Sequence, residues 1–165
     1  AAEIGVDGID VVSALTLTGG DAAATITGAI SESSVDAINT ATTGLVTVTD
    51  VQTDDTTFDL STALGDLSEL TGLTTIDAAT DGATTAMTIT AADLFAANDT
   101  AGDLTFTITG GTANGESDTL DLSTGAETWE TTDGGATYTT TGNFDGVDGN
   151  ETYTVNVTDV AVTVA

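Results

Sequence analysis

Short runs in which an apolar side chain alternates with Thr or Asp recur along almost the whole chain. Examples are Met87 with Ile89, Leu120 with Leu122, and the run 153–157, and further runs lie at 11–17, 46–48 and 104–108. Because successive side chains of a strand point to opposite faces, each run has one apolar and one polar face. The alternation predicts half-buried strands of antiparallel sheets that cover a core on one side.

Turns and short helices separate these runs. Clusters of Gly and Asp at 132–135 and 144–150 predict turns between strands. The segments 31–41 and 90–99 carry a helical spacing of apolar residues, and Thr90 is a suitable N-cap for the second of them. We expect one to two helical turns in each segment.

The charge composition narrows the function. The chain has 27 Asp and Glu residues, no Lys, Arg or His, and a formal net charge of -27. We therefore expect no nucleic-acid partner, and anionic membranes are poor partners, because proteins bind both through Lys and Arg. No apolar run is long enough to insert into a membrane. A Thr-rich and Asp-rich chain without Cys suits an extracellular, cell-surface location.

The same composition argues against catalysis. A nucleophilic triad needs a base such as His or Lys, and phosphoryl transfer needs a Lys or Arg clamp. Paired carboxylates remain the only catalytic chemistry available, and some pairs are expected by chance among 27 acids. The sequence therefore predicts that the protein is not an enzyme. A carbohydrate-binding or hydrolytic domain is one function class that we consider, and the sequence offers little support for it.

Oxygen-rich loops make calcium the candidate cofactor, because Ca²⁺ binds several carboxylate, amide and carbonyl oxygens. Asp54 and Asp55 form one acidic pair in a predicted loop. None of the acidic loops matches the spacing of an EF-hand or of a glycine-rich calcium repeat. The predicted metal ligands occupy two further loops and are Asn98, Asp99, Asp103, Asp145, Asp148, Asn150 and Glu151.

Three sequence matches give the chain a resemblance to a known family. They are ITAADLFAANDTAGDLTFTITGG (89–111), DGGATYTTTGNFDGVDGNETYTVNVTD (133–159) and VAVTVA (160–165). In their order and spacing, residues 89–165 resemble the cadherin-like, immunoglobulin-like tandem domains of large bacterial surface adhesins. The resemblance implies a seven-stranded antiparallel β-sandwich and calcium in the loop that contains Asn98. It also implies core or corner positions for five aromatic residues, Phe106, Trp129, Tyr138, Phe144 and Tyr153.

The domain organisation follows from this resemblance. We expect an all-β, immunoglobulin-like antiparallel β-sandwich at 89–165, and a β-rich module or an added sheet of uncertain type at 1–88. The fold would thus contain one or two modules with one or two short helical turns. A weak similarity between 33–50 and 74–91, at an offset of about 41 residues, suits tandem β units.

The junction of the last two runs leaves two structures open. Tyr153, Val155 and Val157 occupy odd positions, whereas the apolar residues of 160–164 occupy even ones. A regular strand would send the two sets to opposite faces. Either a bulge or tight turn lies at Thr158 and Asp159, or the last strand leaves its own sheet. In the second case it could pair with a neighbouring subunit.

The predicted function is a non-catalytic structural or adhesive module of a bacterial-type surface protein. The alternative is a subunit of an extracellular filament, pilus-like or surface-layer, that assembles by β-strand exchange. The expected partners are neighbouring copies or modules of the same assembly, with a glycan as a further candidate ligand. Asn98, Asn150 and Asn156 each begin an N-glycosylation acceptor pattern.

Overall fold

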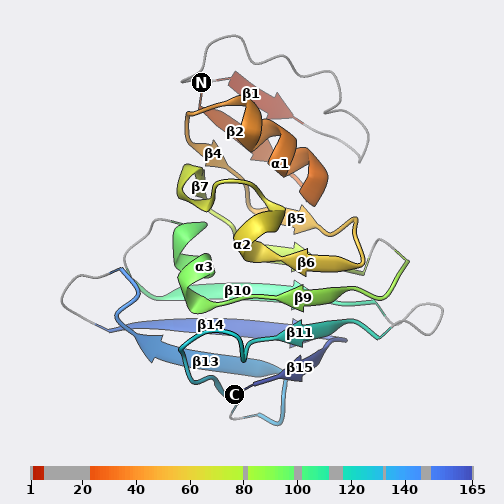
Figure 1. Ribbon diagram of the computed structural model, residues 1–165, viewed down its shortest axis with the longest axis vertical. Helices are drawn as coiled ribbons and strands as arrows, with labels where there is room; N and C mark the ends of the chain where they lie inside the picture. Colours follow the sequence, from red (N-terminus) through yellow and green to blue (C-terminus); the bar gives the residue numbers. More distant parts are fainter. Residues whose placement is uncertain are drawn as a thin grey trace.

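The computed structural model shows a chain that winds in successive coils stacked along the long axis of the molecule (Figure 1). It describes residues 2–5, 23–79, 82–98, 102–111, 117–131, 133–145 and 150–164. The predicted strand at 11–17 lies outside this part of the chain. The described residues form three sheets, and the strands of each sheet come from successive coils.

The first sheet contains four parallel strands in the order β1-β2-β4-β7. Their bounds are β1 (Ala2–Gly5), β2 (Ala24–Thr27), β4 (Val46–Thr47) and β7 (Leu70–Thr71). The third sheet also has four parallel strands, in the order β15-β11-β9-β6. Their bounds are β6 (Thr57–Asp59), β9 (Ala86–Thr88), β11 (Thr119–Asp121) and β15 (Ala161–Thr163).

The second sheet is mixed and has seven strands in the order β12-β13-β14-β10-β8-β5-β3. Five are parallel, namely β3 (Ile30–Ser31), β5 (Asp50–Gln52), β8 (Thr75–Asp77), β10 (Leu104–Thr109) and β14 (Glu151–Thr158). The other two, β13 (Thr137–Gly142) and β12 (Glu130–Thr131), extend this sheet in antiparallel pairing. They lie on the side of β14 opposite to β10.

Each complete coil visits the three sheets in turn. The strands β4, β5 and β6 make one coil, and β7, β8 and β9 make the next. Because equivalent strands pair in parallel, equivalent residues stand side by side, as Val51 and Ile76 do. The architecture is a β-solenoid in which each coil packs on its neighbours.

Short helices lie where one coil passes to the next, in a column along one side (Figure 1). They are α1 (Glu32–Ala41), α2 (Leu60–Ala63) and α3 (Ala91–Ala96), with the 3₁₀ turn η2 (Leu67–Glu69). Both segments predicted to be helical contain a helix, and α1 is longer than expected. Thr90 begins α3 with a capping box, because its hydroxyl accepts from the Asp93 amide and the Asp93 carboxylate accepts from the Thr90 amide.

The core consists of apolar ladders that run through the stacked coils. In the second sheet each inward residue is paired with the next, and in the third sheet a parallel ladder contains Phe58, Met87 and Leu120. Burying such a branched or aromatic side chain contributes about 1.5–3 kcal/mol. The ladder of the second sheet, all of it buried, is Ile30, Val51, Ile76, Ile108 and Val157.

The predicted antiparallel immunoglobulin-like sandwich is wrong. β10 is parallel to both of its neighbours, β8 and β14, and β11 is parallel to both β9 and β15. The alternation of apolar and polar residues indicates which side chains face the core, but it does not indicate strand direction. In a solenoid the chain returns around the core to the next coil, so a parallel sheet keeps an outer face for polar residues.

The expected boundary between residues 88 and 89 falls at the end of β9. That strand pairs on one side with β6, which precedes it, and on the other with β11, which follows it. The second sheet likewise contains strands from both parts of the chain. Two hydrogen-bonded sheets therefore continue across this position.

The aromatic residues implied as core or corner positions are mostly buried. Phe106, Trp129, Tyr138 and Tyr153 are all in the core. Phe144 is half-buried, and its ring centroid lies 4.4 Å from that of Tyr153. These positions hold although the fold around them differs from the expected one.

A turn at Asp159 connects the last strand of the second sheet along the chain, β14, to the last strand of the third sheet, β15. Asp159 has a φ of 56°, in the left-handed region. β14 precedes this turn in the second sheet, and β15 follows it in the third, where it pairs with β11 of the same chain. The structure thus combines the two alternatives. A tight turn lies at Asp159, and the last strand leaves the sheet of β14, but its partner is β11 of the same chain.

Candidate functional site

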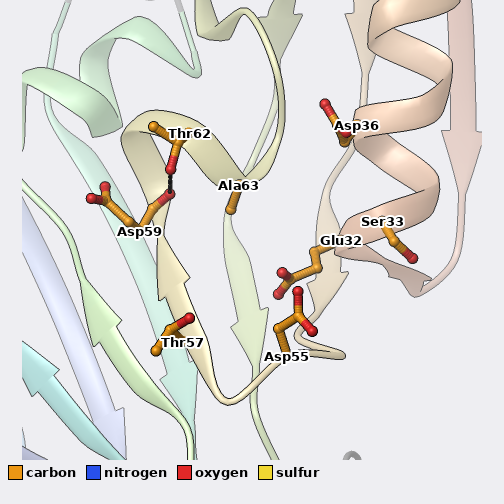
Figure 2. Close-up of a pocket in the computed structure, with 8 residues that line it drawn as sticks. All are labelled: Glu32, Ser33, Asp36, Asp55, Thr57, Asp59, Thr62 and Ala63. Atoms are coloured by element: carbon orange, nitrogen blue, oxygen red, sulfur yellow. Dashed lines mark hydrogen bonds between the residues drawn. The ribbon is translucent and has the colours of Figure 1, made fainter.

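An acidic pocket of about 350 Å³ lies between α1, α2 and the loop that joins β5 to β6 (Figure 2). Four of its eight lining residues are carboxylates, and the others are mainly hydroxyl-bearing. The lining consists of Glu32, Ser33, Asp36, Asp55, Thr57, Asp59, Thr62 and Ala63. The chain has no Lys, Arg or His to balance these charges.

Strand pairing brings the acidic residues of the pocket together. Ser31, the last residue of β3, pairs with Gln52, the last residue of β5. Glu32 begins α1 directly after Ser31, so its side chain lies beside the residues that follow Gln52. Those residues include Asp54 and Asp55. Two acidic segments from successive coils therefore meet at one edge of the second sheet.

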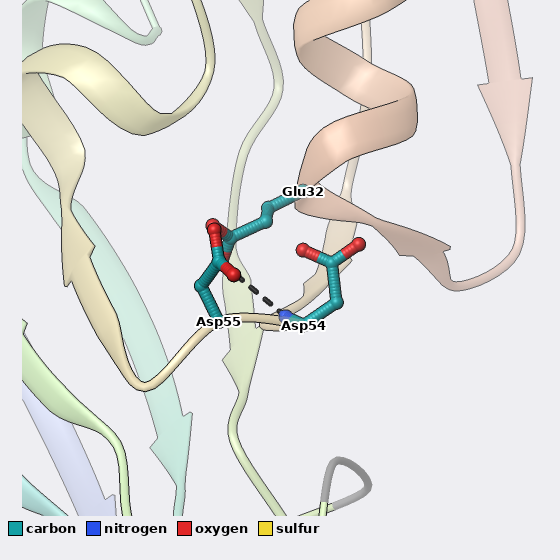
Figure 3. A group of neighbouring side chains, drawn as sticks. All are labelled: Glu32, Asp54 and Asp55. Atoms are coloured by element: carbon teal, nitrogen blue, oxygen red, sulfur yellow. Dashed lines mark hydrogen bonds between the residues drawn. The ribbon is translucent and has the colours of Figure 1, made fainter.

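Two of the lining carboxylates, Glu32 and Asp55, form a cluster with Asp54, and the carboxylate oxygens of the three residues all lie within 4.8 Å of one another (Figure 3). Glu32 is buried with 5% of its surface exposed, whereas both Asp residues are exposed. The Asp54 amide donates to Glu32 Oε2 at 3.4 Å, and the Ser33 hydroxyl donates to the Asp54 carboxylate. Such a set of oxygens suits a hard cation such as Ca²⁺.

Asp59 serves local structure on the opposite wall of the pocket. Asp59 Oδ1 accepts from the Ser61 amide at 3.0 Å and from the Ser61 hydroxyl at 2.7 Å, which caps α2. The Thr62 hydroxyl donates to the Asp59 carbonyl oxygen at 3.3 Å. Asp36, the remaining lining carboxylate, accepts from the Thr40 hydroxyl at 3.5 Å. Glu32, Asp54 and Asp55 are the carboxylates grouped closely enough to share a cation.

The predicted ligands near α3 hold the fold together. Asn98 is buried, its Nδ2 donates to the Leu94 carbonyl at 3.0 Å, and its own carbonyl accepts from the Thr71 hydroxyl at 3.0 Å. Asp103 Oδ1 accepts from the Thr152 amide at 2.8 Å. Asp99 lies outside the described residues.

The second predicted loop lies at the same end of the second sheet as the first, because β10 and β14 are parallel and in register. Glu151 is buried, and its Oε2 accepts from the Phe144 amide at 2.8 Å. Asp145 is half-buried and Asn150 is exposed. Asp148 lies outside the described residues. The two loops are thus neighbours, joined by the bond from Thr152 to Asp103.

Burial first, and then the nearby Glu151 and Asp145 carboxylates, raise the pKa of the Tyr153 phenol to about 12. The Tyr153 hydroxyl is buried and has no hydrogen-bond partner among the described residues. The carboxylates of this loop region therefore act electrostatically on a buried side chain of the core. This favours the neutral form of the tyrosine.

Sequence reasoning identified Asp54 and Asp55 but missed Glu32. The adjacent Asp residues are visible in the sequence, whereas Glu32 joins them only through the pairing of β3 with β5. The signal that could have found Glu32 is its place directly after Ile30 and Ser31, one coil before Val51 and Gln52. Recognising that signal requires knowing that the strands pair in parallel.

Comparison with known proteins gives no match. Among the described residues, no helix has the length and apolar character needed to span a membrane. No protein-family model matches the chain, and no curated protein and no solved structure matches it either.

Proposed function

We propose that the chain is a non-catalytic structural and adhesive module of an extracellular, bacterial-type surface assembly. The observation that carries the proposal is the continuous ladder from Ile30 to Val157, which joins five coils through buried apolar contacts. A solenoid of this kind is extended along one axis and presents long side faces. These properties suit a spacer or a binding unit between neighbouring modules.

The net charge of the chain suits a module whose copies do not aggregate. A net charge of -27 keeps molecules soluble and discourages non-specific association. The chain also has no His, Lys or Cys that could act as a base or nucleophile. Both features favour a structural role over a catalytic one.

Calcium binding is part of this proposal. Glu32, Asp54 and Asp55 supply three carboxylates, and bound Ca²⁺ would offset their mutual repulsion. The ion would also connect α1 to the loop after β5, and so fasten two successive coils. The parallel ends of β10 and β14, with Asp103 and Glu151, are the second candidate region.

Light scattering on the purified chain across concentration, together with thermal melts, tests whether the chain is a monomeric module that Ca²⁺ stabilises. Both are run with Ca²⁺ and then with a chelator. A monomer at every concentration whose melting temperature rises with Ca²⁺ supports the proposal. Labelling of intact producing cells with an antibody against the chain tests the location. Label found only after cell lysis would contradict it.

A filament subunit is the second candidate, favoured by the open edges of the sheets. β15 lies at one edge of the third sheet and β6 at the other, and an unpaired strand edge is a template for another chain. Val164 next to β15 is one of the exposed large hydrophobic residues. Polymers that grow with concentration and survive chelation would establish this second function in place of the first.

A further inference from the structure

The outer face of the second sheet carries a regular array of threonines on β10, β13 and β14. Ten outward positions on these strands hold nine Thr residues and one Asn, and all ten are exposed or half-exposed. We call this surface the threonine face. Its members are Thr105, Thr107, Thr109, Thr137, Thr139, Thr141, Thr152, Thr154, Asn156 and Thr158.

Strand register arranges these residues in two dimensions. Thr105, Thr154 and Thr139 form one row across the three strands. Thr107, Asn156 and Thr137 form the next row. Neighbouring strands of a sheet are about 4.8 Å apart, and alternate residues along a strand are about 6.8 Å apart. The hydroxyl and methyl groups therefore repeat with two fixed spacings.

The side chains of the face are held in place. A β-branched side chain has a restricted χ1, and both neighbours of β14 fix its backbone by hydrogen bonds. The Thr137 hydroxyl donates to Asn156 Oδ1 at 3.2 Å, and the Thr141 and Thr152 hydroxyls are 3.5 Å apart. A pre-ordered array loses little conformational entropy on binding.

The face is uncharged although the chain carries 27 carboxylates. Acidic residues border the face on both sides, because Asp77 on β8 pairs with Thr109 and Glu130 on β12 pairs with Thr139. A solid surface that contacts only the ten positions between these borders strips water from no carboxylate, which would be costly. The charge distribution therefore favours a neutral ligand on this face.

We propose that the threonine face binds the surface of ice crystals. The two spacings of the array are close to the oxygen repeats on the prism faces of hexagonal ice, so hydroxyls and methyl groups can meet many lattice positions at once. Each contact is weak, and simultaneous contacts from one rigid face add to a firm attachment. This inference does not depend on the proposed surface assembly.

Two other occupants fit less well. A crystalline polysaccharide is bound through aromatic side chains that stack on sugar rings, and none of the ten positions is aromatic. A second copy of the chain would bring together two molecules that each have a net charge of -27. It would also need apolar outward residues for sheet-on-sheet packing.

The test compares ice recrystallisation and adsorption to a growing ice hemisphere for the wild-type chain and two variants. In the first variant, Thr107→Tyr with Thr154→Tyr places two bulky rings in the centre of the face. The matched control is Thr119→Tyr, an outward and exposed position of β11 on the third sheet. Tyr has a high strand propensity, and circular dichroism checks that each variant folds.

We expect the wild type and the control to be incorporated into ice and to arrest recrystallisation, and the double variant to lose at least about tenfold in potency. Exclusion of the wild type from ice overturns the proposal. Equal loss in the control also overturns it. Binding to insoluble cellulose or chitin without binding to ice assigns the face to a polysaccharide, and dimerisation lost in the double variant assigns it to a second copy.

Discussion

The buried carboxylate of Asp118 accepts a hydrogen bond of 2.7 Å from the backbone amide of Thr85, on the preceding coil. Its other oxygen accepts from the Gly111 amide at 2.6 Å. Asp118 precedes β11 and Thr85 precedes β9, so one side chain fastens two paired strands of the third sheet. Asp118→Ala should lower the free energy of unfolding by about 2–5 kcal/mol, because it leaves two amides without acceptors.

Urea unfolding followed by circular dichroism measures the effect of Asp118→Ala. Asp118→Asn keeps one acceptor oxygen and should lose less stability than the Ala variant. Ser117→Ala changes the exposed neighbour of Asp118 and should be nearly neutral. An Ala variant as stable as the Ser117 control would show that the two bonds of Asp118 do not hold the coils together.

Gly110, directly after β10, packs against the corner between β14 and β15, and this position has no room for a side chain. A Cβ atom at this position would lie 2.5 Å from the Asp159 carbonyl oxygen and 2.6 Å from Val160 Cγ2. Gly110→Ala should therefore cost about 1–3 kcal/mol of stability. Adding Val160→Ala removes the clash with Cγ2 but leaves the Asp159 carbonyl oxygen and Asp118 Oδ2, which would lie 2.9 Å from the Cβ, so thermal melts should show partial recovery in the double variant. No destabilisation by Gly110→Ala would mean that the corner adapts freely.

The inward residues of the fold could be predicted from the sequence, but the path of the chain could not. Alternation correctly marks Met87 and Leu120 as buried. Their pairing is hidden, because the length of chain between paired residues varies from coil to coil. The stretch that separates Ile108 from its partner Val157 is much longer than the one that separates Val51 from Ile76. No fixed sequence period survives such unequal loops.

The weak similarity between 33–50 and 74–91 illustrates the same difficulty. It aligns Val46 with Met87, but Val46 lies in the first sheet and Met87 in the third. Both are inward residues of short strands, so the match reflects alternation and not equivalent positions. The acidic site is hidden for a related reason, since Glu32 joins Asp54 and Asp55 only through strand register.

The acidic cluster gives a prediction with opposite signs in two conditions. Asp55→Asn removes one of three carboxylates that lie within 4.8 Å of one another. In chelator the variant should melt higher than the wild type, with about 1 kcal/mol of added stability, because repulsion is relieved. With Ca²⁺ the wild type should gain stability and the variant should gain less. Differential scanning calorimetry in both buffers measures the change.

Asp103→Asn is the matched comparison for this experiment, because it changes one carboxylate in the other candidate region. Loss of the Ca²⁺ response in Asp103→Asn but not in Asp55→Asn would place the ion at the ends of β10 and β14. A wild type that does not respond to Ca²⁺ at all would contradict both sites. The repulsion predicted in chelator would still be measurable in that case.

Tyr153 predicts how stability changes at alkaline pH. Its phenol has a pKa raised from 10.0 to about 12, by burial first and then by Glu151 and Asp145. The neutral phenol is favoured in the folded state, so this contribution to stability is fully present below pH 10 and is lost as the pH rises to about 12. Tyr153→Phe should be about 1 kcal/mol more stable than wild type at neutral pH, because the hydroxyl is buried without a partner among the described residues.

The chain has two tyrosines and no Lys or Cys, so phenolate absorbance reports this titration directly. In a Tyr138→Phe background the remaining signal belongs to Tyr153, and its midpoint should lie near 12 and coincide with unfolding. Tyr153→Phe should shift the alkaline unfolding midpoint upward. A Tyr153 titration near pH 10 with the fold intact would mean that its hydroxyl reaches water, and the stabilising effect of Tyr153→Phe should then be absent as well.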